Sequence, residues 1–316
     1  MNGNDLYGWK NSSSFCFDKF MRTAIIMSEG DVSVVYFVDN MIVHDGIDFE
    51  TDDLDIIDLC YNDIPIKTLN VTCLAHNTTT FLVMYKILIH GQSLTSLFFE
   101  SCEISDDIIE CLGKFLKNNK TVKFIEIKNT TISDTGIKYL TDSIKYNTSI
   151  QELTISDNII SNIAMKYLSD ALKHNKSITD FNFIKNNNQY INNFSVVTIS
   201  KDQKFKNNLM EKKSYKSTIK GFRYLFEMLK INTTITTFYI DFNNINTTNA
   251  KYLNDMLNIN TTIKHLKVIL PNQINCNFYK YIIKGLENNN TVVYFPVEGP
   301  YKKYINKLIF MNNNVV

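Results

Sequence analysis

A period of 28 residues is the feature that most constrains how this chain can fold. Three segments align without gaps, and they begin at Asn119, Asn147 and Asn232. Each repeats one order: apolar, two residues, apolar, one residue, apolar, two residues, an Asn-like residue, one residue, apolar. In the segment from Asn147 these positions are Ile150, Leu153, Ile155, Asn158 and Ile160. A unit that repeats at this interval predicts an array of stacked supersecondary units.

The same frame extends through most of the chain. Its first apolar positions are residues 32, 66, 94, 122, 150, 178, 235, 263 and 292, with steps of 34, 28, 28, 28, 28, 57, 28 and 29 residues. The frame predicts that one set of apolar residues lies in adjacent parallel strands, namely Leu97, Ile125, Leu153 and Phe181. The Asn-like position holds Asn40, Cys102, Thr130, Asn158, Asn186 and Asn243 in individual units.

Each unit combines a short strand with a helix. Alternation places Leu153 and Ile155 on one face of a strand. Ala164, Leu168 and Leu172 follow at four-residue intervals and share one face of a helix. A single strand–helix unit cannot bury its apolar face, whereas stacked units join their faces into one continuous core. The sequence therefore predicts an α/β solenoid.

The repeat resembles the leucine-rich repeat, L-x-x-L-x-L-x-x-N/C-x-L. Its 28-residue length and small-x-x-x-L-x-x-x-L helix are similar to those of the ribonuclease-inhibitor class, and the resemblance covers roughly residues 30–298. It implies a horseshoe with parallel strands on the concave side and helices on the convex side. It also implies a ladder of side chains at the Asn-like position, where an amide can both donate to and accept from backbone groups. The resemblance is specific for fold and unspecific for function.

We expect three parts in the chain. Residues 1–30 form an N-terminal cap with a helix at Phe15–Met27, residues 31–298 form the solenoid, and residues 299–316 form a C-terminal cap helix and tail. The doubled step of 57 residues indicates either a degenerate repeat or an insertion. We favour an insertion at about residues 186–217, because helical periodicity resumes after it. Long loops on rigid scaffolds often carry function, but the sequence equally allows a tolerated insertion.

Asn-x-Ser/Thr triplets recur at Asn77, Asn147, Asn175, Asn232 and Asn260. We interpret them as turns, in which Asn takes the left-handed conformation after a helix and Ser/Thr holds the next turn. The first residues lack a secretion signal, and no apolar run is long enough to cross a membrane. The six cysteines include no C-x-x-C pair and are typical of a reducing compartment, so we expect a cytoplasmic protein.

No catalytic motif is present in the sequence. It contains neither a phosphate-binding glycine loop nor a G-x-S-x-G elbow, and its five histidines lack the spacing of metal ligands. We therefore expect no enzyme activity, no metal and no cofactor. One alternative is a GTPase-activating regulator of the Ran class, which uses similar repeats; many activators supply a catalytic arginine. The chain has only Arg22 and Arg223, predicted in the N-terminal cap and an outer helix. The other alternative is a degenerate repeat protein that binds little.

We expect a protein-binding module that acts as a sensor, inhibitor or adaptor. The resemblance implies that variable strand positions line the concave face, with these candidate binding residues: Phe98, Glu100, Phe124, Glu126, Lys128, Glu152, Thr154, Asp180, Asn182, Tyr239, Asp241, His265 and Lys267. Exposed aromatic residues are common anchors of interfaces, and the acidic residues favour a basic partner protein. The net charge of +1 gives no bulk attraction to nucleic acid or an anionic membrane, and we expect a monomer.

Overall fold

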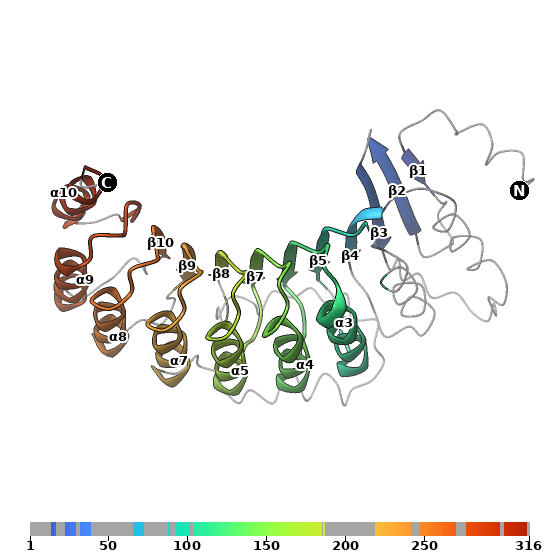
Figure 1. The fold of residues 1–316 in the computed structure, drawn as a ribbon, viewed down its shortest axis with the longest axis horizontal. Helices are drawn as coiled ribbons and strands as arrows, with labels where there is room; N and C mark the ends of the chain where they lie inside the picture. The colour runs from blue at the N-terminus through green and yellow to red at the C-terminus, as the bar shows by residue number, and fades with distance from the viewer. Residues whose placement is uncertain are drawn as a thin grey trace, which may run out of the picture.

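The computed structural model describes residues 14–16, 23–29, 32–38, 66–72, 88, 93–101, 104–184, 186, 219–241, 247–269, 276–297 and 300–314. Within these ranges one ten-stranded sheet follows the order of the chain from β1 to β10 (Figure 1). From β3 onward each strand runs parallel to the next, which makes seven parallel pairs. The architecture is an open α/β sheet of parallel strands alternating with helices, as in a solenoid.

The elements are short and regular. The strands are β1 Ser14–Cys16, β2 Thr23–Glu29, β3 Val32–Val38, β4 Ile66–Thr72, β5 Ser96–Glu100, β6 Phe124–Lys128, β7 Glu152–Ser156, β8 Asp180–Ile184, β9 Thr237–Asp241 and β10 His265–Ile269. The helices are α3 Asp106–Asn118, α4 Asp134–Ile144, α5 Asn162–Leu172, α7 Ile219–Leu229, α8 Thr247–Leu257, α9 Cys276–Asn288 and α10 Lys302–Asn313. Helices α3 to α9 lie side by side along one side of the sheet (Figure 1). None of the helices in these ranges has the length and apolar character needed to cross a bilayer.

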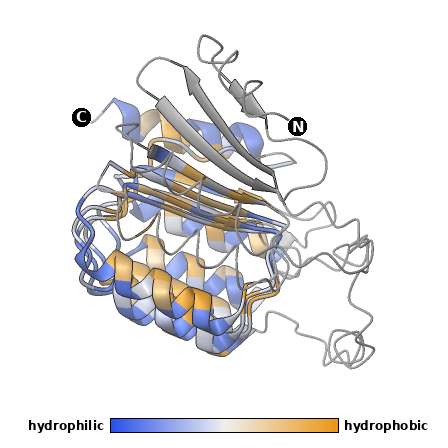
Figure 2. Ribbon diagram, turned by 90° about the vertical axis from the view of Figure 1, so that its right-hand side faces the viewer, coloured by the Kyte–Doolittle hydropathy of each residue, from blue (hydrophilic) through white to orange (hydrophobic). Residues whose placement is uncertain are grey.

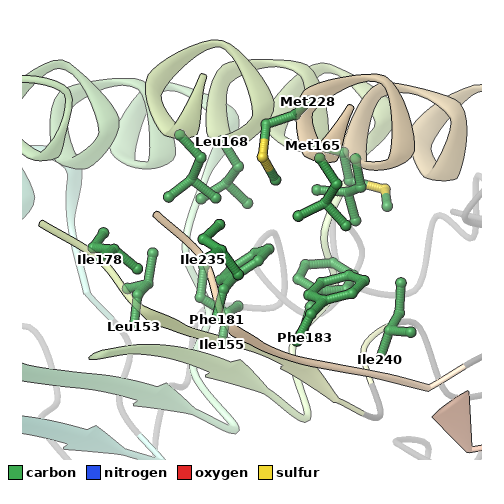
Figure 3. Close-up of a cluster of buried hydrophobic side chains, with 14 of the residues drawn as sticks. Leu153, Ile155, Met165, Leu168, Ile178, Phe181, Phe183, Met228, Ile235 and Ile240 are labelled. Atoms are coloured by element: carbon green, nitrogen blue, oxygen red, sulfur yellow. The ribbon is translucent and has the colours of Figure 1, made fainter. Parts of the chain in front are cut away.

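The predicted strand register is confirmed. Leu97 pairs with Ile125, Ile125 with Leu153, and Leu153 with Phe181 in consecutive parallel strands. These side chains are at most 1% exposed and form the part of the core that the sheet contributes. Figure 3 shows two of them, Leu153 and Phe181, facing helix residues such as Leu168 and Met165. Burial of each such side chain contributes about 1.5–3 kcal/mol, so stacking is the main source of stability.

The doubled repeat step lies between β8 and α7. Phe181 of β8 pairs directly with Phe238 of β9, and their rings stack with centroids 5.7 Å apart. Helix α5 packs against α7, which is the helix that the structure describes between these two strands. The doubled step therefore places no strand between β8 and β9 in the described sheet, and an insertion within one unit stays a prediction. Residues 187–218 lie outside the described ranges.

The predicted N-terminal helix at Phe15–Met27 is wrong. The structure has strands β1 and β2 there, and β2 pairs with β3 in antiparallel register, with Ile26 opposite Val35. The sequences of β2 and β3 are TAIIMSE and VSVVYFV, rich in β-branched residues that favour a pleated surface. Gly30-Asp31 between them is typical of a two-residue hairpin connection.

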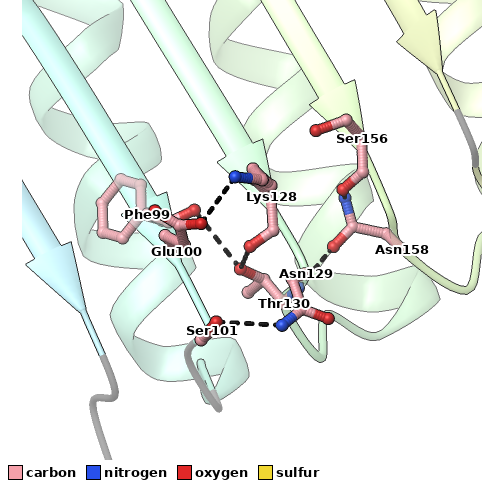
Figure 4. Close-up of polar contacts among 8 residues, drawn as sticks. All are labelled: Phe99, Glu100, Ser101, Lys128, Asn129, Thr130, Ser156 and Asn158. Atoms are coloured by element: carbon pink, nitrogen blue, oxygen red, sulfur yellow. Dashed lines mark hydrogen bonds and ion pairs between the residues drawn. The ribbon is translucent and has the colours of Figure 1, made fainter. Parts of the chain in front are cut away.

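The ladder at the Asn-like position is present after β6, β7 and β8. The backbone N–H of Thr130 donates to Asn158 Oδ1 at 2.6 Å (Figure 4). The backbone N–H of Asn158 donates in turn to Asn186 Oδ1 at 2.9 Å. The Nδ2 groups donate to the carbonyls of Ile127 and Ile155, both at 2.8 Å. Each side chain thus joins two units. Asn40, Cys102 and Asn243 lie outside the described ranges.

A second ladder runs along the helix ends, and we call it the helix-end ladder; its members are Asn119, Asn147, Asn175, Asn232, Asn260 and Asn289. Asn175 is typical: its Oδ1 accepts from Ser177 N and Ile178 N at 2.9 and 2.7 Å. Its Nδ2 donates to the carbonyls of Ile144 and Asn147 at 2.8 and 3.1 Å.

The predicted left-handed conformation of these asparagines is wrong. Asn119 is extended, with φ −69° and ψ 139°. Among the described residues other than glycine, the left-handed ones are Ser101, Asn129 and Asp157, at strand ends. The asparagines recur because their side chains replace the backbone hydrogen bonds that are lost at the turn, which requires no positive φ.

Candidate functional site

The face of the sheet that points away from the helices is the candidate binding surface. In β5 to β10 the side chains alternate between buried core positions and positions on the other face of the sheet, most of which remain partly exposed. We call the second set the open face: Ser96, Phe98, Glu100, Phe124, Glu126, Lys128, Glu152, Thr154, Ser156, Asp180, Asn182, Ile184, Thr237, Tyr239, Asp241, His265, Lys267 and Ile269. All thirteen predicted site residues belong to it.

The parallel register orders the open face into rows across the strands. The middle row consists of Phe98, Glu126, Thr154, Asn182, Tyr239 and Lys267. The row beside it consists of Ser96, Phe124, Glu152, Asp180, Thr237 and His265. Adjacent strands lie about 4.8 Å apart, so neighbours in a row can act on the same bound group.

The half of the open face on β5 to β8 is acidic. It carries Glu100, Glu126, Glu152 and Asp180 against Lys128, which is four negative charges and one positive charge, or a net −3. Lys128 Nζ lies 2.6 Å from Glu100 Oε1 (Figure 4). This hydrogen bond is the main reason that the pKa of Lys128 is raised. Three carboxylates are left without a lysine of their own on this half.

Two of these carboxylates are held by neighbours on the face. Glu152 Oε1 accepts from Asn182 Nδ2 at 3.1 Å, and Asn182 Nδ2 also donates to Thr154 Oγ1 at 3.0 Å. Asp180 Oδ2 accepts from the hydroxyl of Thr179 at 2.6 Å. These bonds fix the carboxylates in place without neutralising them.

Glu126 lies in the middle row of the acidic half. It is half-buried, and in the sheet it lies between Phe98 and Thr154. Burial is the first cause that raises its pKa, and the charges of Glu100, Glu152 and Asp157 raise it further against the opposing effect of Lys128. The ionised form of Glu126 is therefore short of a cation.

Aromatic side chains occupy both halves. Phe124 is 38% exposed, while Phe98 and Tyr239 are half-buried. Lys267 Nζ lies 5.5 Å from the centre of the Tyr239 ring, a cation–π arrangement. Tyr294, which was not among the predicted residues, also borders the face: its ring meets that of His265 edge-on, with centroids 5.9 Å apart. The frame that begins at Val292 indicates this residue, because Tyr294 is equivalent to His265 of the preceding unit.

Two residues of the open face contribute less than the sequence suggested. Asp241 and Ser156 are each only 7% exposed. Both are the last residues of their strands, where the chain begins to turn. Asp241 therefore adds nothing to the exposed acidic half.

Elsewhere, few reactive groups gather in the described part of the chain. Arg223 lies on helix α7 with its guanidinium 5.9 Å from the ring of Tyr252, away from the open face. Arg22 lies outside the described ranges. No group of three or more His, Cys, Asp or Glu in these ranges could hold a metal ion.

No protein-family model and no curated protein matches this sequence. Among solved structures, the chain is similar to "Leiomodin-1 Actin-Binding Site 2 (ABS2)" at 13% sequence identity. The match covers 64% of this chain and 88% of that chain, with a TM-score of 0.35.

Proposed function

We propose that this chain is a leucine-rich-repeat protein of the ribonuclease-inhibitor-like class that binds another protein on its open face and catalyses no reaction. Support for the class comes from the 28-residue frame, the parallel register and the amide ladder of Asn158 and Asn186. In this proposal the open face is the concave side of a horseshoe.

The partner that fits best is a basic segment of another protein. The observation that carries this is Glu126, half-buried among like charges and beside the exposed ring of Phe124. A lysine or arginine of the partner supplies the missing cation, and its aliphatic stem packs on Phe98 and Phe124. Aromatic residues next to desolvated charges are typical of binding hot spots.

The raised pKa of Glu126 links partner binding to pH. A bound cation favours the ionised carboxylate, so binding lowers this pKa and releases a proton. The affinity should therefore rise with pH through the pKa of the free protein and level off once Glu126 is fully ionised.

The test uses a lysine-rich synthetic peptide and a triple variant, Glu100→Gln, Glu126→Gln and Glu152→Gln. We expect the variant to bind at least about tenfold more weakly in fluorescence anisotropy, which corresponds to about 1.4 kcal/mol. The matched control neutralises three acids on the outer helix surfaces, Glu110, Asp142 and Asp170, whose surface ion pairs contribute little. Equal affinity of the open-face variant and wild type would refute a basic partner on this surface.

A second variant tests the aromatic anchors. Substitution of Phe98, Phe124 and Tyr239 by serine should weaken partner capture while circular dichroism stays unchanged. The control replaces Ile159 and Ile163 by serine. Ile159 follows strand β7 and Ile163 lies at the start of helix α5, and their side chains are 45% and 55% exposed. If the aromatic variant captures the same proteins as wild type and as the control variant, the three aromatic residues are not part of the binding site.

A further inference from the structure

The turns that follow the helices form a second surface, which is distinct from the open face. We call it the ladder edge; it comprises residues 117–121, 145–149, 173–177, 230–234, 258–262, 287–291 and 310–313. The helix-end ladder holds these turns in line, as when Asn147 Nδ2 donates to the carbonyl of Asn119 at 3.0 Å. Asn312 of α10 continues the ladder, with Nδ2 donating to the carbonyls of Asn289 and Val292 at 2.9 and 2.8 Å. Viewed along the stack, the turns of successive units superimpose (Figure 2).

Large apolar side chains protrude from this edge at one repeated position. Each ladder asparagine turns its amide inward, so the residue directly before it points outward. That residue is Tyr146, Ile231, Ile259 or Met311 in four of the units, with exposed fractions of 68%, 57%, 55% and 55%. Phe310, 66% exposed, lies next to Met311. Single exposed apolar side chains are ordinary on a protein surface, but four at one repeated position form a row that another surface can contact.

Lysines accompany the apolar residues along the edge. Lys117, Lys145, Lys173 and Lys230 each lie two residues before a ladder asparagine, and Lys120 and Lys176 each lie one residue after. The helix dipole favours cations in the last turn and accounts for the first four. Lys173 and Lys230 are paired with Asp170 and Glu227 at 3.2 and 2.7 Å. Lys120 and Lys176 lie past the helix ends and are not explained by the dipole; both are exposed, as is Lys117. With Glu287 at the equivalent position in the last unit, the turns carry six lysines against one acid.

We propose that the ladder edge docks on an anionic lipid surface. Tyr146, Ile231, Ile259 and Met311 lie in separate units, each at the position directly before a ladder asparagine. A bilayer interface accepts such anchors one at a time, and the lysines beside them attract acidic headgroups. The acidic half of the open face is repelled by the same headgroups. Docking therefore orients the protein, with the edge on the lipid and the binding face left available.

The experiment measures co-sedimentation of the purified full chain with vesicles. Vesicles of an equal mixture of phosphatidylcholine and phosphatidylserine should bind the protein, and added salt should weaken the binding. Vesicles of phosphatidylcholine alone should bind it much less. A protein that stays in the supernatant with the mixed vesicles at low ionic strength would overturn the proposal.

Two variants connect the binding to the edge. Ile231→Ser with Ile259→Ser removes two anchors, and its control is Ile159→Ser with Ile163→Ser at the opposite edge. Neutralisation of Lys117, Lys120 and Lys176 to glutamine should lower the partition coefficient by about fivefold for each lysine, or roughly a hundredfold in total. Its control neutralises Lys166, Lys280 and Lys284, which are exposed on helices α5 and α9. Circular dichroism verifies that each variant is folded.

The outcomes separate a lipid surface from a protein partner. Loss of vesicle binding in both edge variants, with both controls unchanged, supports the proposal. Binding that the edge variants keep refutes it. Without vesicles, the edge variants should sediment as wild type does. A changed sedimentation velocity together with unchanged vesicle binding also refutes the proposal, because the exposed apolar residues would then form a contact between two copies of the chain. The aromatic open-face variant keeps its charges and should bind vesicles as wild type does, so this proposal can fail independently of the function proposed above.

Discussion

Replacement of Asn175 tests how much the helix-end ladder contributes to stability. Asn175 is 0% exposed and makes four hydrogen bonds to backbone groups. The substitution Asn175→Ala leaves two buried N–H groups and two buried carbonyls without these partners. At about 1 kcal/mol for each bond, the expected loss is about 4 kcal/mol, a large fraction of the 5–15 kcal/mol typical of a domain.

Asn175→Asp separates the donor half of the side chain from the acceptor half. The acceptor bonds to Ser177 and Ile178 remain, but an oxygen replaces the Nδ2 that lies 2.8 Å from the Ile144 carbonyl. Repulsion and burial of charge should make this variant at least as unstable as the alanine variant at neutral pH. They also raise the pKa of the new carboxyl, so stability is lost as pH rises through that pKa. The protonated carboxyl regains a donor, and the aspartate variant should therefore recover in acid relative to the alanine variant.

Urea denaturation followed by circular dichroism measures these changes as shifts of the midpoint at constant slope. Asn290→Ala is the control, because Asn290 is exposed and directly follows the ladder residue Asn289. A loss below about 1 kcal/mol in Asn175→Ala, or a loss equal to that of the control, would show that the ladder bonds are replaceable by water and would refute the reasoning.

Three further predictions concern single sites. Glu126→Gln should raise the melting temperature at neutral pH, because the raised pKa of Glu126 means that its ionisation disfavours the fold. The difference from wild type should vanish in acid, where the carboxyl of Glu126 is protonated. A pH series of thermal melts measures both effects. Gly113→Ala should destabilise by about 1–3 kcal/mol in urea despite the better helix propensity of alanine, because the new Cβ would lie 2.9 Å from the Tyr139 carbonyl oxygen; an unchanged midpoint would contradict that contact. Thr130→Asn should stabilise by about 1 kcal/mol, since Thr130 Oγ1 reaches the Phe99 carbonyl only at 3.4 Å; a fall in the midpoint would show that the longer side chain does not fit.

The repeating part of the fold could be predicted from the sequence because its determinants are local. Residues such as Leu153 and Phe181 recur at a fixed interval, and stacking converts that interval directly into register. The first strands could not be predicted this way. The segment from Phe15 to Met27 lies outside the frame, and its structure depends on pairing of β2 with the strand that follows it.

The candidate site could be predicted as a set of positions but not as an electrostatic surface. The frame identified Glu126 and Asp241 equally, whereas the structure leaves one half-exposed and buries the other. The net charge of +1 concealed the separation of acidic and basic surfaces. The recurring asparagines were noticed, but their partners lie about 31 residues away, as from Asn175 to Ile144, and no local rule connects such residues.

The helix-end ladder has a consequence for covalent modification. Asn147, Asn175, Asn232 and Asn260 each begin an Asn-x-Ser/Thr triplet, and Nδ2 is the atom to which an oligosaccharide would be joined. In each of them this nitrogen donates to a carbonyl of the unit before it, at 2.7–2.8 Å. An attached sugar would remove a hydrogen from the nitrogen and would need the space that the preceding turn fills. Glycan attachment at these four residues and assembly of the stack are therefore mutually exclusive.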